Sequence, residues 1–203
     1  MAERKPRKDA VRNRAAVFAA ADDLFTHCRN ADDVTMADIA TAAGVGKATL
    51  FRAFGDRTGL IRSLYEARLE PVREAVEQGP PPLGPTAAPL ERVPAVLDAV
   101  LCLKFDNRHL ALALESAGSD SPYRTEHYAG WHALIRDLLR RIPGPADSDF
   151  TAHALLAATR ADLVTYLAGD EGLSREEIRD RLASFTATVL DARARQGAAT
   201  SEG

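Results

Sequence analysis

The stretch VTMADIATAAGVGKATLFRAFGDRTGL, residues 34–60, has the form of two short helices joined by a tight turn. Thr35 is followed three residues later by Asp38, which is a capping box: each side chain can bond the backbone N–H of the other residue where a helix begins. Gly44 suits the position just after a helix, where a positive φ is needed. The spacing therefore predicts a first helix over residues 36–43.

A second helix is predicted over residues 47–54, starting after Gly46 and ending at Gly55-Asp56. An isolated helix of fewer than ~12–15 residues is marginal in water, so its neighbours must hold this one in place. The apolar residues that can pack the two helices together are Ile39, Ala40, Ala43, Val45, Leu50 and Phe54. The outer side then carries Lys47, Ala48, Thr49, Phe51 and Arg52. This arrangement has the spacing of a helix-turn-helix.

A short helix that is supported from behind can enter the major groove of DNA. Lys47 can donate to guanine O6 and N7, Thr49 can bond to either kind of base edge, and Ala48 can contact a thymine methyl group. Many αα corners also contain a glycine between two helices. The motif alone therefore leaves both DNA binding and a purely structural corner open.

Charge is distributed unevenly along the chain. Residues 1–68 hold 12 Lys and Arg against 9 Asp and Glu, whereas the rest of the chain holds 14 against 20, for a net charge of −3. Six basic residues fall within the first 14 positions: Arg4, Lys5, Arg7, Lys8, Arg12 and Arg14. A basic end on an acidic chain indicates a polyanionic partner for that end, and a solvated tail is the alternative.

The longer stretch VTMADIATAAGVGKATLFRAFGDRTGLIRSLYE closely resembles the N-terminal domain of the TetR (tetracycline-repressor) family of bacterial transcription regulators. The resemblance covers about residues 10–66 and lies in the order and spacing of Thr35, Ile39-Ala40, Ala43-Gly44-Val45, Thr49-Leu50-Phe51, Phe54, Arg57 and Leu60. It implies that Lys47, Ala48 and Thr49 face bases and that Thr35, Phe51 and Arg57 face phosphates. With Gly46 and Arg52 from the same helix, the predicted DNA-binding set is Thr35, Gly46, Lys47, Ala48, Thr49, Phe51, Arg52 and Arg57.

Three positions depart from the pattern of that family. Gly46 stands where Ser is frequent, so the second helix lacks a side-chain N-cap, although Gly at this position costs only roughly a few tenths of a kcal/mol. Phe51 stands where Tyr is common, and it has no hydroxyl to bond a phosphate. Arg57 stands where Lys is frequent and keeps the positive charge.

Abundant Ala and Leu favour helix along the rest of the chain. We expect an all-α protein of about nine helices and no strand, with later helices from residue 57 onward, from Ser121-Pro122 to 141, and over 90–117, 150–168 and 174–195. Residues 78–89 hold five prolines and two glycines, which predicts a semi-rigid connector. The predicted domains are a helix-turn-helix domain at 8–66 and, as the resemblance implies, an effector-binding and dimerisation domain at 67–197.

The helices over 150–168 and 174–195 carry more apolar residues than one internal face needs, so they predict either a dimer interface or a plain core: Leu155, Leu156, Leu163, Val164, Leu167, Ile178, Leu182, Phe185, Val189 and Leu190. Candidate effector contacts are polar or aromatic residues on apolar helices: Phe105, His109, Tyr128, Trp131, His132, Arg160 and Tyr166. The charge of Arg160 needs a partner, which Asp162, an anionic ligand or solvent could supply.

Other classes of function find less support in the sequence. It contains no nucleophile elbow, Walker loop, HExxH or dinucleotide fingerprint, so we predict no catalytic site and no cofactor. His127 and His132 are five residues apart, and the two cysteines, Cys28 and Cys102, lie in apolar helical stretches, so we predict no metal site. No apolar run is long enough to span a membrane.

We therefore predict a cytoplasmic homodimer that binds double-stranded DNA sequence-specifically, a transcriptional repressor that an unidentified small molecule releases. The alternative is a helical adaptor or an enzyme domain that has a basic tail and no DNA specificity.

Overall fold

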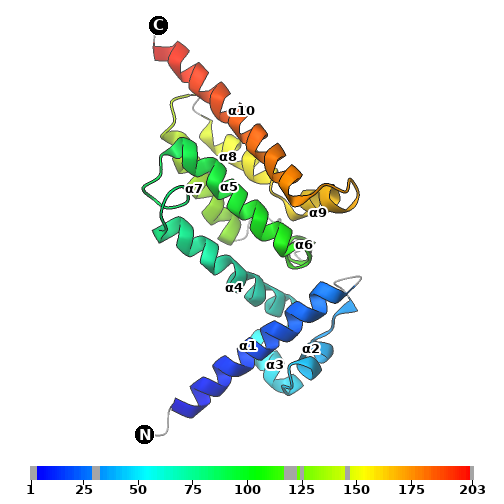
Figure 1. Ribbon diagram of the computed structural model, residues 1–203. Coiled ribbons are helices and arrows are strands. Elements are labelled where there is room, and N and C mark those ends of the chain that lie inside the picture. Colours follow the sequence, from blue (N-terminus) through cyan, green and yellow to red (C-terminus); the bar gives the residue numbers. More distant parts are fainter. Residues whose placement is uncertain (1–3, 29–32, 117–122, 124–125, 145–146, 202–203) are drawn as a thin grey trace. The chain divides into compact units, whose positions relative to one another are not determined.

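The computed structural model describes residues 4–28, 33–116, 123, 126–144 and 147–201, and within these ranges the chain is helical with no strand (Figure 1). The predicted all-α fold is confirmed. The helices are α1 (Arg4–His27), α2 (Met36–Ala42), α3 (Lys47–Phe54), α4 (Arg57–Gln78), α5 (Pro89–Asp106), α6 (Arg108–Ser116), α7 (Glu126–Arg140), α8 (Ser148–Ala157), α9 (Ala161–Gly169) and α10 (Arg175–Ser201). In the part of the chain that the structure describes, no helix is both long enough and apolar enough to cross a membrane.

The helices group into two compact units. The first comprises Met1–Ala67 with His109–Ala117, and the second comprises Arg68–Arg108 with Gly118–Gly203. α4 therefore contributes residues to both units, and nearly all of α6 belongs to the first. The domain limits predicted from the sequence, 8–66 and 67–197, remain predictions.

The first unit is held together by apolar side chains of α1 to α4. α1 packs against α2, and α2 packs against α3. Apolar residues recur every three to four positions along α1, which places them on one side of that helix. The buried residues of these helices include Val17, Ala21, Phe25, Ile39, Ala40, Leu50, Leu60, Ile61 and Leu64.

The helix predicted over 90–117 is divided in two at Asn107, between α5 and α6. The Asn107 side-chain amide donates to the Leu103 carbonyl over 2.9 Å, and the Asn107 backbone N–H donates to the same carbonyl over 3.1 Å. An Asn side chain that bonds a carbonyl of the preceding turn competes with continuation of the helix. The apolar pattern on both sides of Asn107 hid this boundary in the sequence.

The helix predicted over 150–168 is also divided, at Thr159 and Arg160, into α8 and α9. The buried Thr159 hydroxyl donates to the Leu156 carbonyl over 2.8 Å, which closes the last turn of α8. Arg160 then adopts an extended conformation, with φ −62° and ψ 142°, from which α9 starts. The helix start predicted at Ser121-Pro122 lies outside the described residues, and α7 is described from Glu126.

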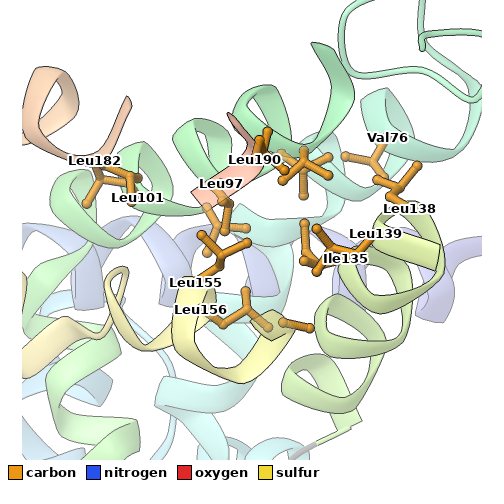
Figure 2. Packing of buried hydrophobic residues seen from close by; sticks show 14 of the residues in the cluster. Val76, Leu97, Leu101, Ile135, Leu138, Leu139, Leu155, Leu156, Leu182 and Leu190 are labelled. Atoms are coloured by element: carbon orange, nitrogen blue, oxygen red, sulfur yellow. The ribbon is translucent and has the colours of Figure 1, made fainter. Parts of the chain in front are cut away.

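The core of the second unit combines apolar side chains from α4, α5, α7, α8, α9 and α10. α5 lies along α10, and α7 packs against α8. Figure 2 shows these side chains pointing toward one another, with labels on Val76, Leu97, Leu101, Ile135, Leu138, Leu139, Leu155, Leu156, Leu182 and Leu190.

α10 begins with a capping box. The Ser174 hydroxyl oxygen accepts from the Glu177 N–H over 3.2 Å, and the Glu177 carboxylate accepts from the Ser174 N–H over 2.8 Å. These bonds lower the pKa of Glu177, the bond from the Ser174 backbone being the largest cause. The predicted start of this helix is confirmed, and the helix runs to Ser201.

The proline-rich segment belongs to the second unit and is fastened to α5 by Arg92. The Arg92 side chain is buried; its Nε donates to the Leu83 carbonyl over 2.8 Å and its Nη2 donates to the Val76 carbonyl over 2.7 Å. Gly84 is buried as well, and a Cβ atom there would collide with the Gly79 carbonyl. Burial lowers the pKa of Arg92, because it disfavours the charged form. The segment is therefore a packed part of its unit.

Candidate nucleic-acid interface

The first helix of the motif, α2, begins with the predicted capping box. Thr35 is extended; its hydroxyl oxygen accepts from the Asp38 N–H over 3.2 Å, and the Asp38 carboxylate accepts from the Thr35 N–H over 3.1 Å. The bond from the Thr35 hydroxyl is the largest cause that lowers the pKa of Asp38, and the positive charge of Lys47 adds a small contribution. The prediction for the start of α2 is confirmed.

The turn between the two helices depends on glycine. Gly44 has φ +65°, which confirms the positive φ expected where α2 ends. The Val45 N–H donates to the Ala40 carbonyl over 3.0 Å, so the turn closes on α2 itself. Gly46 is the N-cap of α3 and provides no side-chain bond. Gly55, with φ +78°, ends α3.

α3 turns one side toward the core and the other toward solvent. Leu50 is 1 % exposed, whereas Phe51 is 48 % exposed. Lys47, Ala48 and Arg52 are exposed as well, and Thr49 is half-buried at the edge. The residues predicted for the outer side of the helix therefore lie on one accessible surface.

Arg57 is tied into the fold where α4 begins. Its Nε donates to the Val34 carbonyl over 2.9 Å, and its guanidinium lies 5.6 Å from the centre of the Phe25 ring. Val34 directly precedes Thr35, so this bond fixes the approach of the chain to α2. The sequence did not reveal this structural contact, which Arg57 makes in addition to the phosphate-facing position that the resemblance implies.

This stretch is the part of the chain that a family model matches. The model for bacterial regulatory proteins of the TetR family matches residues 17–64, which include all of α2 and α3. The chain belongs to the TetR family. It is a DNA-binding transcriptional regulator and not an enzyme, in agreement with the prediction.

Similarity to known regulators extends beyond the first unit. The TetR-family chain is 24% identical over 183 residues to the HTH-type transcriptional regulator SAR0097 of Staphylococcus aureus (strain MRSA252), covering 89% of this chain and 95% of the relative. It is 34% identical over 114 residues to the HTH-type transcriptional repressor LfrR of Mycolicibacterium smegmatis, covering 47% of this chain and 60% of that relative. The crystal structure of LfrR from Mycobacterium smegmatis in complex with proflavine has a similar fold, with a TM-score of 0.59 at 22% identity over 88% of this chain and 96% of that one.

The structure of this TetR-family regulator brings three of the predicted effector contacts onto one core. Phe105, Tyr128 and Trp131 are partly buried against the apolar cluster of the second unit. Tyr166, in contrast, is 51 % exposed. His109 belongs to the first unit.

Arg160 has one of the three partners considered from the sequence. Its Nε and Nη2 lie 2.9 and 2.7 Å from the two carboxylate oxygens of Asp162. Its guanidinium also lies 5.7 Å from the centre of the Tyr123 ring. The bond from Arg160 is the largest cause of the lowered pKa of Asp162. The charge of Arg160 is therefore balanced within the chain.

Tyr128 and His132, both candidates from the sequence, form a cluster of polar aromatic side chains on α7 and α8 with His153, which was not predicted. The Tyr128 hydroxyl lies 2.6 Å from His153 Nδ1, and the rings of His132 and His153 stack with their centres 3.8 Å apart. Burial raises the pKa of Tyr128 to about 12, which keeps the phenol protonated. Asp149 and His153 lie one helical turn apart, a spacing that the sequence did offer. His132 comes from α7, so only the folded chain brings it to the cluster.

Proposed function

We propose that this TetR-family regulator represses transcription by placing α3 of each subunit of a homodimer in the major groove of an operator, and that a small molecule bound by the second unit releases it. The division of α3 into two sides carries the proposal. Leu50 holds the helix to the core, while Lys47 and Phe51 face solvent. A short helix that is braced in this way fits a major groove.

The contacts can be divided by what each group offers. Lys47, Ala48 and Thr49 occupy the N-terminal half of α3, which in helix-turn-helix proteins faces base edges. Thr35 and Gly46 lie at the N-termini of α2 and α3, where backbone N–H groups favour phosphate. Exposed Phe51 and Arg52 would then border the groove, with Arg52 able to pair with a phosphate and Phe51 able to contact sugar.

Exposed apolar side chains on α9 and α10 support a homodimer. Leu163, Tyr166 and Phe185 are 39, 51 and 42 % exposed. Since α9 and α10 contact one another, these side chains can form one surface that repeats in a two-fold interface. Other residues considered for this interface are buried in the chain's own core: Leu155, Leu156, Val164, Ile178, Leu182 and Leu190.

The solved structure of the relative LfrR holds proflavine, which supports a small-molecule effector for this chain. Phe105, Tyr128 and Trp131 are the contacts that we propose, because they combine aromatic surface with a place in the core of the second unit. Such a ligand can release DNA only if it binds the DNA-free state more tightly than the bound state.

The test begins with selection of duplexes from a random pool by the purified full-length protein. The best sequence is then titrated at several salt concentrations. We expect a near-palindromic sequence and, for six to ten phosphate contacts, a log–log salt slope of about −5 to −9. Equal affinity for every duplex would overturn the proposal.

Two substitutions locate the reading surface. Lys47→Ala and Thr49→Ala should relax the preference at particular operator positions, each costing roughly 1–3 kcal/mol there. The matched control is Arg181→Ala, which removes an exposed basic side chain from α10 and should leave binding unchanged. If Lys47→Ala kept the full sequence preference, another face of α3 would have to read the bases.

A further inference from the structure

A carboxylate and two imidazoles converge between α7 and α8, within the second unit. His132 Nε2 lies 3.6 Å from one carboxylate oxygen of Asp149, and His153 Nε2 lies 3.9 Å from the other. One donor atom from each of the three residues can be chosen so that all three lie within 4.8 Å of one another. No residue of this group takes part in the proposed contacts with DNA.

These distances suit a metal ion. Two ligand atoms that are each 2.0–2.2 Å from a tetrahedral Zn²⁺ stand about 3.4 Å apart. The observed separations of 3.6 and 3.9 Å run to different oxygens of the Asp149 carboxylate, and the three donor atoms together lie within 4.8 Å of one another. The two imidazoles therefore have to rotate out of their stacked arrangement to close on one ion. Asp149 and His153 are presented by the same face of α8, one turn apart, so the helix itself sets two of the three ligand positions.

Tyr128 orients one of the imidazoles. Its hydroxyl oxygen lies 2.6 Å from His153 Nδ1 and can accept a hydrogen bond from the N–H at that position. The tautomer with a proton on Nδ1 leaves the lone pair of Nε2 directed toward Asp149. Metal-binding histidines characteristically use their second nitrogen in this way, to bond a neighbouring oxygen.

We propose that His132, Asp149 and His153 bind one first-row divalent transition-metal ion, with Zn²⁺ as the best fit. Two imidazole nitrogens and one carboxylate oxygen are a ligand set that Zn²⁺ accepts, and three protein ligands leave a position for water or another ligand. The Asp149 side chain is 60% exposed and that of His132 is 12% exposed, so the site opens toward solvent on the side of the carboxylate.

Two neighbouring groups compete with the metal ion, the Arg136 guanidinium and the Asp149 carbonyl oxygen. Arg136 Nη1 lies 4.0 Å from the Asp149 carboxylate. A bound ion would replace this arginine beside Asp149, and Arg136 would keep Asp137 as the partner of its Nε. His132 Nε2 also lies 3.2 Å from the Asp149 carbonyl oxygen. Metal binding by His132 Nε2 would therefore replace a hydrogen bond to this carbonyl. The neutral imidazoles that coordination requires avoid the repulsion that two stacked imidazolium ions would feel.

The experiment is calorimetric titration of Zn²⁺ into the metal-free full-length protein, with Co²⁺ as a spectroscopic substitute. We expect one ion per chain and the visible absorption bands of four- or five-coordinate Co²⁺. A thiolate-to-cobalt charge-transfer band should be absent, because such a band would report binding by Cys28 or Cys102. Zn²⁺ should also raise the melting temperature of the protein, since it binds the folded state preferentially. Mg²⁺, which prefers six oxygen ligands, should not do so.

His132→Gln, Asp149→Asn and His153→Gln should each weaken Zn²⁺ binding at least tenfold. The control is His27→Gln. His27 and Asp23 form a pair with the same helical spacing on α1, 3.3 Å apart, but among the described residues no third ligand completes this pair. It should bind Zn²⁺ as the wild type does. Helical content and operator binding, measured on every variant, identify any loss that comes from misfolding.

Tyr128→Phe sharpens the test, because it removes only the hydroxyl beside His153. We expect an affinity 10–100-fold weaker with the cobalt bands retained, as for loss of a group that orients a ligand. The proposal is overturned if the wild-type protein binds no Zn²⁺, if the three ligand substitutions leave the affinity unchanged, or if cobalt reports thiolate ligands. None of these results bears on the proposed binding of DNA.

Discussion

The helix-turn-helix and the α7–α8 cluster are both compact groups of polar side chains, but they are assembled differently. The bonds that shape α2 and its turn join residues three to five positions apart, such as Thr35 with Asp38 and Ala40 with Val45. The cluster instead joins Tyr128 to His153 across 25 positions. In a locally bonded motif the helix starts and the turn are set by its own glycines and caps, and the core behind it holds the helices in place. The cluster depends on how α7 is aligned along α8, so distant changes in packing can alter its geometry.

The largest expected effect comes from removing one buried leucine in each region. Leu50→Ala and Leu155→Ala each truncate a side chain that is at most 1 % exposed, and each should lower the free energy of unfolding by about 2–5 kcal/mol. Leu50→Ala should accelerate hydrogen exchange in α2 and α3, whereas Leu155→Ala should do so in α7 and α8. Hydrogen exchange followed by mass spectrometry measures both. If each substitution loosened both regions equally, the two would not be separable in stability.

The next effect in size concerns the ring of Phe51. Phe51→Tyr adds a hydroxyl to an exposed ring, and a hydrogen bond to a charged group contributes about 1.5–3 kcal/mol at best. We expect roughly 0.5–2 kcal/mol tighter binding to cognate and non-cognate DNA alike, with little change in stability. Titration of both duplexes with wild type and variant measures this.

Phe54→Tyr is the matched control on the same helix. The Phe54 ring packs 5.9 Å from the Phe18 ring and 5.5 Å from the Arg14 guanidinium, within the first unit. It should therefore gain no affinity for DNA. A gain at position 54 that equalled the gain at position 51 would mean that a different side of α3 meets the backbone.

The two capping boxes allow a comparison in which each substitution should change the free energy of unfolding by about 1 kcal/mol. Thr35→Ala and Ser174→Ala each remove an N-cap hydroxyl, and each should cost about 1 kcal/mol of stability. Only Thr35→Ala should also weaken DNA binding, because α2 belongs to the proposed interface. Urea unfolding and operator titration give the two quantities. Equal loss of DNA affinity in both variants would remove Thr35 from the set of phosphate contacts.

The smallest effect is a dependence on pH. The pKa of Asp38 is lowered in the folded chain from an ordinary value of 3.8, and that of Glu177 from 4.5. Each carboxylate therefore contributes stability above these values, and the contribution is lost as the pH falls through the lowered pKa. Asp38→Asn and Glu177→Gln should be less stable than the wild type at neutral pH, with a difference that shrinks toward about pH 3. Urea unfolding across this range would contradict the prediction if the difference stayed constant.

The same contrast explains what the sequence could predict. The caps at Thr35 and Ser174 and the turn at Gly44 depend on residues close together in the chain. The amino-acid sequence was therefore sufficient to predict them. The breaks at Asn107 and Thr159 were missed, because each depends on a side chain taking a carbonyl of the preceding turn within an otherwise apolar stretch. His153 was missed because its partners lie on two helices, and no periodicity of one helix reports a neighbour on another.

Arg92 also changes how the chain can be cut or extended. By composition, the segment between α4 and α5 is where one would insert a tag, place new termini or introduce a protease site. One guanidinium, however, clamps the carbonyls of Val76 and Leu83, which stand on either side of the first prolines. Any residue added between them would move one acceptor away from a buried cation. The segment whose composition resembles a linker is therefore a poor site for an insertion, a protease site or new termini.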